Sequence, residues 1–427
     1  MSEAHRDDQR AGFWRDDQGN ACIGGAQVAE LLAAAGLPTP VYLYDLDGIE
    51  GAARDLVAAL NDERHLVAYA IKANSAASIV RRIASAGCGA DLVSGGELEV
   101  ALACGMEPRR IVMSGVAKSD QEIDRAISLG LLAIQAESVS ELPRIAARAK
   151  AQGQLARVSL RVNPGVEIDS HAHIATGHDE AKFGIVERDL GAAFEYVKAN
   201  PTALCITGIS THVGSMLRDP EPYLESAKTV CAVARTWLQR KGSLEFVDFG
   251  GGFGIDYGEG PCEPPSSFAR SALGLLEQQG LSALGLVIEP GRALVGPFGV
   301  LATRVLQLKQ SGERRWAMVD AGMNDLIRPA LYAAKHRIEP AAELPHGVSW
   351  RVVGPVCESS DDFGEHLLCA EPRGVLVIRD AGAYGYAMAS EYNGRALPGE
   401  IFVSAGRVTH SAPSPGVASW VKRRLQA

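Results

Sequence analysis

The chain has 427 residues, of which 47% are hydrophobic and 22% charged, and its formal net charge is 42 − 51 = −9. This length favours two domains, and the composition is typical of a globular protein. The acidic balance, without a long basic run, argues against nucleic acid or an anionic membrane as partner.

We see no pattern in the sequence that indicates a signal peptide, a membrane-spanning helix, or a zinc or disulfide arrangement of cysteines. The chain begins without an apolar run behind a basic one, and no stretch approaches the about 18 apolar residues of a spanning helix. The eight cysteines include no C-x-x-C pair, so neither structural zinc nor a disulfide framework is expected. We therefore expect a cytoplasmic protein without a membrane partner.

The first 296 residues contain two kinds of segment. Residues 1–41 hold a Gly-rich turn and one short helix, expected over Ala26–Ala35; they are too few for a core and are expected to pack on the C-terminal domain. From residue 42 to 296, β-type runs alternate with helical stretches, which predicts a (β/α)8 barrel. The expected strands are Leu66–Ile71, Ala90–Val93, Arg110–Ser114, Leu131–Gln135, Arg157–Val162, Leu204–Ser210, Glu245–Phe249 and Gly285–Glu289.

The pattern of apolar and turn-forming residues changes after Pro297. Strand-like runs separated by Gly and Pro replace the helical stretches, so residues 297–427 are expected to form an all-β domain. The expected strands are Val300–Lys309, Arg315–Asp320, Ser349–Val353, Gly374–Arg379 and Glu400–Val403. The predicted fold is thus α/β: a barrel followed by an all-β C-terminal domain.

Lys72 is the most informative residue of the chain. It lies in Y-A-I-K-A-N (Tyr69–Asn74), where the first barrel strand meets a polar stretch. An amine placed at the end of a buried strand loses hydration, which frees its lone pair for attack on a carbonyl. A lysine that forms a Schiff base needs this environment. The alternative is a surface lysine at the start of a helix.

Other polar residues follow the last three expected barrel strands, where the active sites of such barrels and their phosphate sites lie. The sixth strand runs into T-H-V-G-S, with His212 and Ser215. The seventh ends in consecutive glycines, whose backbone can approach a phosphate closely. The eighth ends in E-P-G-R, where a buried carboxylate would require a cationic partner. These two ends supply Gly250, Gly251 and Gly252, and Glu289, Gly291 and Arg292.

A lysine, a phosphate cradle, a carboxylate and a flat imidazole together suggest pyridoxal 5'-phosphate. Lys72 would bind the aldehyde covalently, and the glycines would receive the phosphate. Glu289 would keep the ring nitrogen protonated, and His212 would stack on the ring. Each residue also has an ordinary alternative, since a lone histidine is more often a core residue and a Gly-rich turn is often only a tight connection.

The motifs of the whole chain, in order, resemble those of the fold-type III pyridoxal phosphate-dependent decarboxylases, most closely the diaminopimelate decarboxylases. Y-A-I-K-A-N is similar to the lysine motif of this family. The other matching motifs are A-D-L-V-S-G-G-E-L (Ala90–Leu98), R-V-N-P-G (Arg161–Gly165), His171–Gly184, E-P-G-R, G-P-V-C-E-S-S-D (Gly354–Asp361) and G-A-Y-G (Gly382–Gly385). Met216 and Ser359 depart from the usual glutamine and glycine, and neither is a reacting group.

The resemblance implies an activity and assigns roles to further residues. The implied reaction is decarboxylation of meso-2,6-diaminopimelate at its D-centre to L-lysine, the last step of lysine biosynthesis. Cys357 would protonate the carbanion in the partner subunit's active site, which implies a homodimer. Glu358 would bind the distal amino group of the substrate. Arg328 and Tyr332, with Arg292, would hold the distal carboxylate, and Tyr384 would contact both phosphate and substrate.

A dicarboxylic substrate also suits the residue types, because guanidinium groups are rigid forks matched to carboxylates. Three alternatives remain open. The first is a decarboxylase of the same fold that acts on ornithine, arginine or a carrier-bound glutamyl group. The second is alanine racemase, which needs a base on each face of the ring. The third is a non-catalytic, cofactor-binding homologue, although such proteins usually lose the lysine or the cysteine.

Two smaller groups of residues have open interpretations. His171, His173 and His178 could suggest a metal site, but no Asp or Cys at ligand spacing accompanies them, so no metal is expected. Asp91, Ser94 and Arg161 either orient Lys72 and the cofactor or merely cap the ends of strands.

Overall fold

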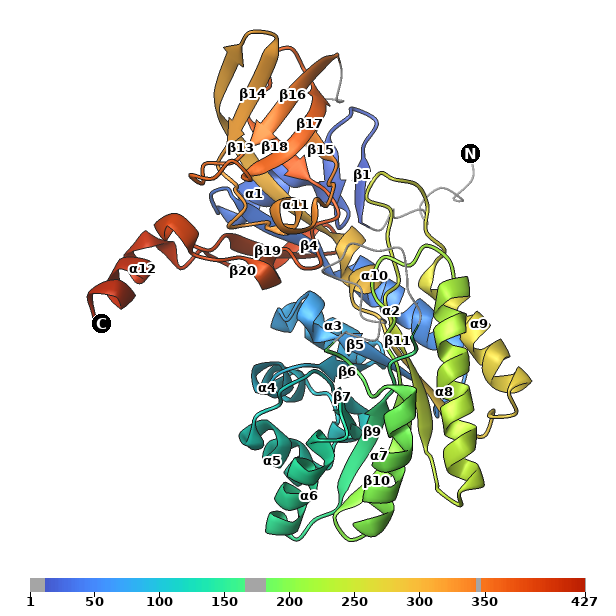
Figure 1. Cartoon of the computed structure of the whole chain (residues 1–427). Helices are drawn as coiled ribbons and strands as arrows, with labels where there is room; N and C mark the ends of the chain where they lie inside the picture. Colours follow the sequence, from blue (N-terminus) through green and yellow to red (C-terminus); the bar gives the residue numbers. More distant parts are fainter. Residues whose placement is uncertain (1–11, 166–181, 343–346, 427) are drawn as a thin grey trace. The chain divides into compact units, whose positions relative to one another are not determined.

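The computed structural model describes residues 12–165, 182–342 and 347–426 and divides into two compact units (Figure 1). Residues 52–255 and 261–293 form one unit. The described residues up to 51, residues 256–260 and the described residues from 294 onward form the other. The motif histidines His171, His173 and His178 lie outside the described residues.

The unit built on residues 52–255 contains a closed barrel of eight parallel strands. All eight predicted barrel strands occur, so the expected barrel is confirmed. Two of them, Leu204–Ser210 and Gly285–Glu289, have the predicted bounds. The strands are β5 (Leu66–Ala70), β6 (Gly89–Leu92), β7 (Ile111–Met113), β8 (Ala133–Ala136), β9 (Ala156–Arg161), β10 (Leu204–Ser210), β11 (Phe246–Gly251) and β12 (Gly285–Glu289).

Helices connect successive barrel strands, and their ends follow from local sequence signals. Helix α5 begins with a capping box, in which Ser119 and Glu122 each accept a hydrogen bond from the other's backbone N–H. It ends at Gly130, which has a left-handed conformation. The connecting helices are α3 (Ala77–Ser85), α4 (Gly95–Ala103), α5 (Asp120–Leu129), α6 (Glu141–Gln152), α7 (Glu187–Ala199), α8 (Glu221–Gln239) and α9 (Pro265–Gln278). Helix α2 (Leu46–Leu60) precedes β5, and α10 (Arg292–Val295) follows β12.

Apolar side chains fill the barrel near the beginnings of its strands. Phe246 is the largest member of this cluster, and it needs a glycine opposite, because a Cβ on Gly208 would lie 2.3 Å from its ring. The other buried members are Leu66, Ala68, Ala133 and Val287. This packing closes the interior at one end and leaves the carboxyl ends of the strands for polar groups.

The other unit is dominated by one sheet with the order β17-β16-β14-β13-β4-β19-β20; in addition, β18 pairs with β13, and β15 pairs with β18. All five strands predicted after Pro297 occur, so the expected β-rich C-terminal region is confirmed. The strands are β4 (Val41–Asp45), β13 (Gly299–Ser311), β14 (Arg314–Val319), β15 (Ile338–Pro340), β16 (Val348–Val353), β17 (Asp362–Leu368), β18 (Val375–Ile378), β19 (Gly399–Ser404) and β20 (Arg407–Ala412).

The N-terminal elements share the apolar core of this sheet. Ile23 and Val28 lie in one buried cluster with Val300 and Ile401. The expected helix over Ala26–Ala35 begins later, because residues 26 and 27 form the short strand β3 beside β2. These elements are β1 (Phe13–Arg15), β2 (Ala21–Ile23), β3 (Ala26–Gln27) and α1 (Val28–Ala35). The short helices α11 (Arg328–Tyr332) and α12 (Gly416–Leu425) complete the unit.

Among the helices of the described residues, none is both long and apolar enough to cross a membrane.

Candidate active site

Lys72 lies in a turn of 3-10 helix (Ile71–Ala73) directly after β5, at the carboxyl end of the barrel. Its Nζ is 3.2 Å from Oδ2 of Asp91, a fully buried residue at the end of β6. The turn is held by Tyr69, whose hydroxyl donates to the carbonyl of Asn74 at 2.8 Å. Asp91 therefore contacts the lysine rather than merely ending a strand.

His212 follows β10, and its surroundings determine which ring nitrogen carries a proton and whether the ring is charged. Its Nδ1 accepts a hydrogen bond from the Gly251 backbone N–H at 3.2 Å, so a neutral ring carries its proton on Nε2. Burial, followed by the charges of Lys72 and Arg161, holds the pKa of His212 well below its ordinary value. The ring is therefore neutral at pH 7, and its 3.8 Å approach to Glu289 is not an ion pair.

Glu289, at the end of β12, shares a buried environment with Asp248 of β11. The amide of Gln135 donates to both, at 3.0 Å to Glu289 Oε1 and 2.9 Å to Asp248 Oδ2. Burial raises the pKa of Asp248 to about 7. Burial, followed by the negative charges of Asp248 and Asp91, raises the pKa of Glu289 well above its ordinary value. The two carboxyl groups therefore retain a proton between them near neutral pH.

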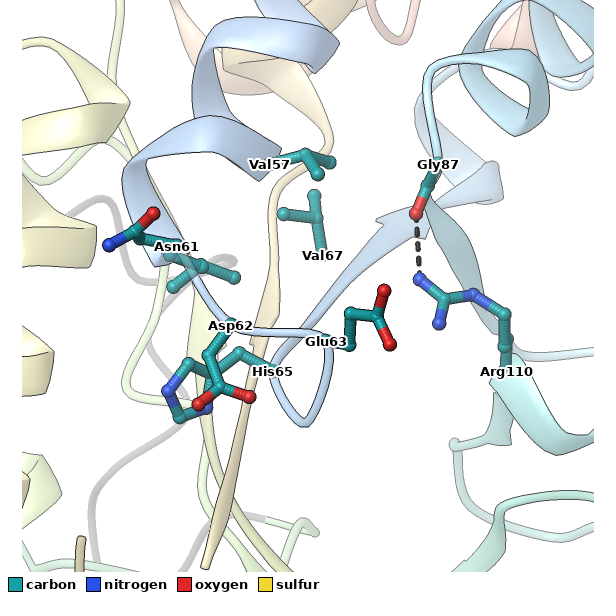
Figure 2. Close-up of a pocket in the computed structure, with 9 residues that line it drawn as sticks. Val57, Asn61, Asp62, Glu63, His65, Val67, Gly87 and Arg110 are labelled. Carbon is teal, nitrogen blue, oxygen red and sulfur yellow. Dashed lines mark hydrogen bonds between the residues drawn. The ribbon is translucent and has the colours of Figure 1, made fainter.

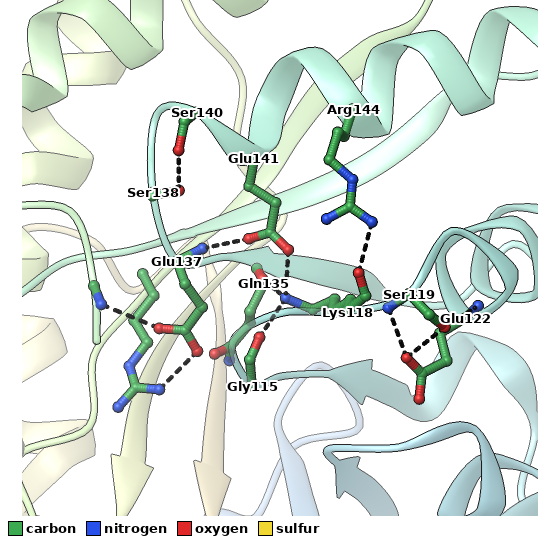
Figure 3. Close-up of polar contacts among 12 residues, drawn as sticks. Gly115, Lys118, Ser119, Glu122, Gln135, Glu137, Ser138, Ser140, Glu141 and Arg144 are labelled. Atoms are coloured by element: carbon green, nitrogen blue, oxygen red, sulfur yellow. Dashed lines mark hydrogen bonds and ion pairs between the residues drawn. The ribbon is translucent and has the colours of Figure 1, made fainter. Parts of the chain in front are cut away.

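A buried polar network behind the site fixes Gln135 (Figure 3). The Nζ of Lys118 donates to the carbonyls of Gly115 and Gln135, each at 2.6 Å, and lies 3.1 Å from Glu141 Oε1. Glu137, two residues after Gln135, receives Arg161 Nη1 at 2.8 Å. Because these charges are buried and paired, the backbone that carries Gln135 has little freedom to move.

The loops after β10, β11 and β12 meet with little side-chain volume between them. Gly252 has a φ of +97°, and a Cβ there would lie 2.5 Å from the carbonyl oxygen of Gly214. Arg292 Nη2 donates to Ser215 Oγ at 3.0 Å, which brings a cation and a hydroxyl to the same place. A Cβ on Gly291 would lie 3.1 Å from that of Ala70. Small residues with one guanidinium make a suitable anion site.

Gly251 differs from a glycine whose backbone N–H points to a phosphate. Its N–H donates to His212 and that of Gly250 donates to Asp248 at 2.8 Å, so both hydrogen bonds are used within the protein. Gly251 is nevertheless constrained, because a Cβ would lie 1.9 Å from the Glu289 carbonyl oxygen. In this structure Gly251 therefore orients His212 and packs β11 against β12.

The remaining predicted site residues lie in the unit that contains the large sheet. Cys357 is exposed, and its backbone N–H donates to Asn393 Oδ1 at 3.0 Å. Glu358 Oε1 accepts from the Tyr392 hydroxyl at 2.5 Å. The Asp361 carboxylate ties this segment to the chain near Arg328, because it accepts from the N–H groups of Met323 and Val356, each at 2.6 Å.

Arg328 is a buried cation of this unit, with an exposure of 4%. Its guanidinium lies 4.5 Å from the ring centroid of Tyr257, and its Nη1 is 2.7 Å from His336 Nε2. Tyr332 ends the same short helix and is partly exposed. Tyr384 has a φ of +56°, which is unusual for a residue other than glycine and is a form of strain common at functional sites.

The sequence did not predict several residues that lie around Lys72 in the barrel unit or around Arg328 and Cys357 in the other unit. Asp248 directly precedes the glycines in D-F-G-G-G and Asp361 closes G-P-V-C-E-S-S-D, so both were within reach of the motifs. Gln135, Lys118, His336 and Asn393 stand in no such motif. Each joins the group in its own unit only because the fold of that unit brings distant segments together.

A separate cavity of about 550 Å³ lies at the beginnings of the barrel strands, beside residues that precede β5, β6 and β7 (Figure 2). Arg110 lines it and donates to the Gly87 carbonyl at 2.7 Å. None of the predicted site residues lines this cavity. Active sites of such barrels lie at the opposite end, so this cavity is not the candidate site.

Among the described residues there is no cluster of three or more His, Cys, Asp or Glu side chains that could hold a metal ion. All eight cysteines are free thiols.

Comparison with known proteins gives concordant matches. Residues 46–296 match a family model described as "Pyridoxal-dependent decarboxylase, pyridoxal binding domain". The chain is 38% identical over 395 residues to the diaminopimelate decarboxylase of Zymomonas mobilis, covering 91% of this chain and 93% of that protein. It is 41% identical over 361 residues to the enzyme of that name from Helicobacter pylori, covering 84% and 88%.

Solved structures show the same relationship. The Helicobacter pylori diaminopimelate decarboxylase complexed with L-lysine aligns with a TM-score of 0.85 at 38% identity, over 91% of this chain and 98% of that one. The M. jannaschii enzyme of the same name, in complex with L-lysine, aligns with a TM-score of 0.89 at 31% identity, over 96% and 97%. An arginine decarboxylase of Paramecium bursaria Chlorella virus, at 20% identity, shares the fold.

Proposed function

Because the chain belongs to the pyridoxal-dependent decarboxylases, we propose that it removes carbon dioxide from the D-centre of meso-2,6-diaminopimelate and releases L-lysine. Two observations support this reaction. Relatives named for it are 36–41% identical over most of the chain. The observation that carries the chemistry is the Lys72 amine at the carboxyl end of the barrel, 3.2 Å from Asp91.

The residues of the barrel unit fit pyridoxal phosphate. Lys72 supplies the amine for the aldehyde, and Ser215, Gly252, Gly291 and Arg292 supply small residues, a hydroxyl and a cation for the phosphate. The proton retained by Asp248 and Glu289 suits a ring nitrogen that must stay protonated. His212 is neutral and flat, so it can lie against a charged aromatic ring without repulsion.

When bound, pyridoxal phosphate accepts the electrons of the bond that breaks as carbon dioxide leaves. Glu289 holds a proton at the ring nitrogen and thereby strengthens this electron withdrawal. Asp91, 3.2 Å from Lys72 Nζ, would hold the ammonium group of this lysine whenever it is not joined to the cofactor. Gln135 keeps the Glu289 carboxyl in place through its 3.0 Å hydrogen bond.

We assign most of the substrate contacts to the sheet-containing unit. Arg328 and Tyr332 of this unit, with Arg292 of the barrel unit, bind the carboxylate that is not removed, and Glu358 binds the amino group beside it. Tyr384 contacts both phosphate and substrate. Arg328 supports this assignment most strongly, because a buried guanidinium with a fixed plane is suited to a carboxylate.

Cys357 is proposed as the acid that protonates the substrate carbon after carbon dioxide has left. Its thiol is exposed and its backbone is held by Asn393, so it is available to a second subunit. We propose a homodimer in which each subunit lends Cys357 to its partner's site. A biosynthetic enzyme of this kind is expected in the cytoplasm.

The test is release of carbon dioxide by the purified protein from meso-diaminopimelate, ornithine, arginine and lysine, measured side by side with added pyridoxal phosphate. The proposal predicts release from meso-diaminopimelate, with a preference of about 10⁴-fold or more over the substrates that lack a second carboxylate, because a site built for a polar group rejects analogues without it. Release from ornithine or arginine at equal rates, or no release at all, would refute it.

A further inference from the structure

Arg328 owes its orientation to two aromatic neighbours from other segments of the same unit. It begins the short helix α11, and His336 follows this helix by four residues. Tyr257 comes from residues 256–260, which are far away in sequence but belong to this unit. All three residues are buried, with exposures of 4%, 4% and 5%. The buried setting limits their rotation.

The hydrogen bonds of His336 determine its tautomer. Its Nδ1 is 2.8 Å from the carbonyl oxygen of Arg379, which can only accept, so Nδ1 carries a proton and donates. Its Nε2 is 2.7 Å from Arg328 Nη1, which can only donate, so Nε2 has a free lone pair and accepts. A neutral imidazole with the proton on Nδ1 is the one form that satisfies both contacts.

Tyr257 completes the arrangement from a second direction. The Arg328 guanidinium lies over its ring at 4.5 Å from the centroid, and the ring meets that of His336 edge-on at 5.0 Å and 73°. A ring face below the guanidinium and an acceptor in its plane fix both the tilt and the rotation of the fork. Neither of these two contacts is an ion pair, so both act on the orientation of the guanidinium.

We propose that His336 and Tyr257 are positioning residues that hold Arg328 in the plane required for bidentate recognition of the retained substrate carboxylate. This inference rests on the proposed function. His336 would thus contribute to selectivity for a dicarboxylic substrate. It would do so through its contact with Arg328, without touching the substrate itself. Both N–H groups of one guanidinium edge must face the carboxylate for such a pair, and a rotated fork offers only one.

The main variant is His336→Phe, which keeps a ring but removes the acceptor. His336→Gln restores an acceptor and should recover most of the loss. The exposed His410 stacks on Phe402 in the same unit, and His410→Phe serves as the matched control. Should the Phe variant fail to fold, Tyr257→Leu removes the ring face under Arg328 and should give the same pattern.

Two ligands separate positioning from general damage to the site. L-lysine carries the carboxylate that Arg328 is proposed to bind, whereas cadaverine has the same carbon chain and two amines but no carboxylate. For the holoenzyme with His336→Phe, the Kd of L-lysine and the KM of meso-diaminopimelate should rise about 10- to 100-fold, the range expected for a lost hydrogen bond to a charged group. The Kd of cadaverine, measured by calorimetry, and kcat should change much less.

The inference is overturned if His336→Phe raises the Kd of L-lysine and the Kd of cadaverine by the same factor, or if it changes neither Kd. The proposed function fails separately, if the wild-type protein does not release carbon dioxide from meso-diaminopimelate. The two failures are distinguishable because the lysine and cadaverine affinities are binding measurements.

Discussion

Replacing Asp248 with asparagine removes one of the two buried carboxyl groups that share the Gln135 amide but keeps the size of the side chain. Asp248 has an ordinary pKa of 3.8, and burial raises it to about 7. A difference of about 3 pKa units corresponds to about 4 kcal/mol. Because the folded-state pKa is the higher one, this contribution to stability is fully present below pH 3.8 and is lost as the pH rises through about 7.

The expected result is a difference in the pH dependence of unfolding. Between pH 5 and pH 7 the Asp248 carboxyl of the wild-type fold holds up to one proton that asparagine cannot take up, while the buried Glu289 is present in both proteins. One proton changes the free energy of unfolding by about 1.4 kcal/mol per pH unit, and the uptake falls to one half near pH 7, so the shift is about 2 kcal/mol over this range. The variant should therefore gain stability relative to wild type as the pH rises.

The assay is urea unfolding of the cofactor-free proteins at pH 5, 6 and 7, since a bound ring would compete for the proton. Asp219→Asn, at an exposed position of the barrel unit, is the control and should reproduce the wild-type slope. Parallel curves for wild type and Asp248→Asn would refute the proton held by Asp248 and, with it, the part of this residue in supplying the proton at the ring nitrogen.

Three further predictions concern the reacting groups. Lys72→Ala should lower turnover to background and abolish covalent retention of the cofactor, measured by ultrafiltration after borohydride reduction. Cys357→Ala should lower kcat by about 10²- to 10⁴-fold, the usual contribution of an acid catalyst, with an unchanged cofactor absorbance spectrum; an unchanged kcat would remove its role. Asn393→Gly, which tolerates the φ of +57°, should lower kcat about 2- to 10-fold through the lost hydrogen bond to Cys357. A fall in cofactor affinity instead would show that Asn393 acts elsewhere.

The barrel was predictable from sequence because its strands are short, buried and separated by amphipathic helices. Leu204–Ser210 and Gly285–Glu289 are almost entirely apolar or small, and each is followed by a turn signal. The strands of the other unit that were missed lack this contrast. β20 (Arg407–Ala412) reads R-V-T-H-S-A and has no fully buried residue, so its polarity resembles that of a loop. β4 pairs with β13 and β19, which lie more than 250 residues away.

Candidate site residues could be predicted from the sequence only where they lie in a local sequence motif. Lys72 and His212 lie just after a barrel strand and Glu289 ends one, and parallel strands bring their carboxyl ends to one rim. The Gln135 amide could not be found in this way, because its role depends on contacts with residues 113 and 154 positions further along the chain. Gly251 shows the limit of a motif: the glycine run was recognised, but its N–H donates to His212.

The most direct measurement is borohydride reduction of the purified protein with pyridoxal phosphate, followed by proteolysis and mass spectrometry of the peptides. A pyridoxyl group on Lys72 is the predicted result. A pyridoxyl group on another lysine, or on none, would contradict the account, because every role assigned around the barrel rim depends on the cofactor being joined to that amine.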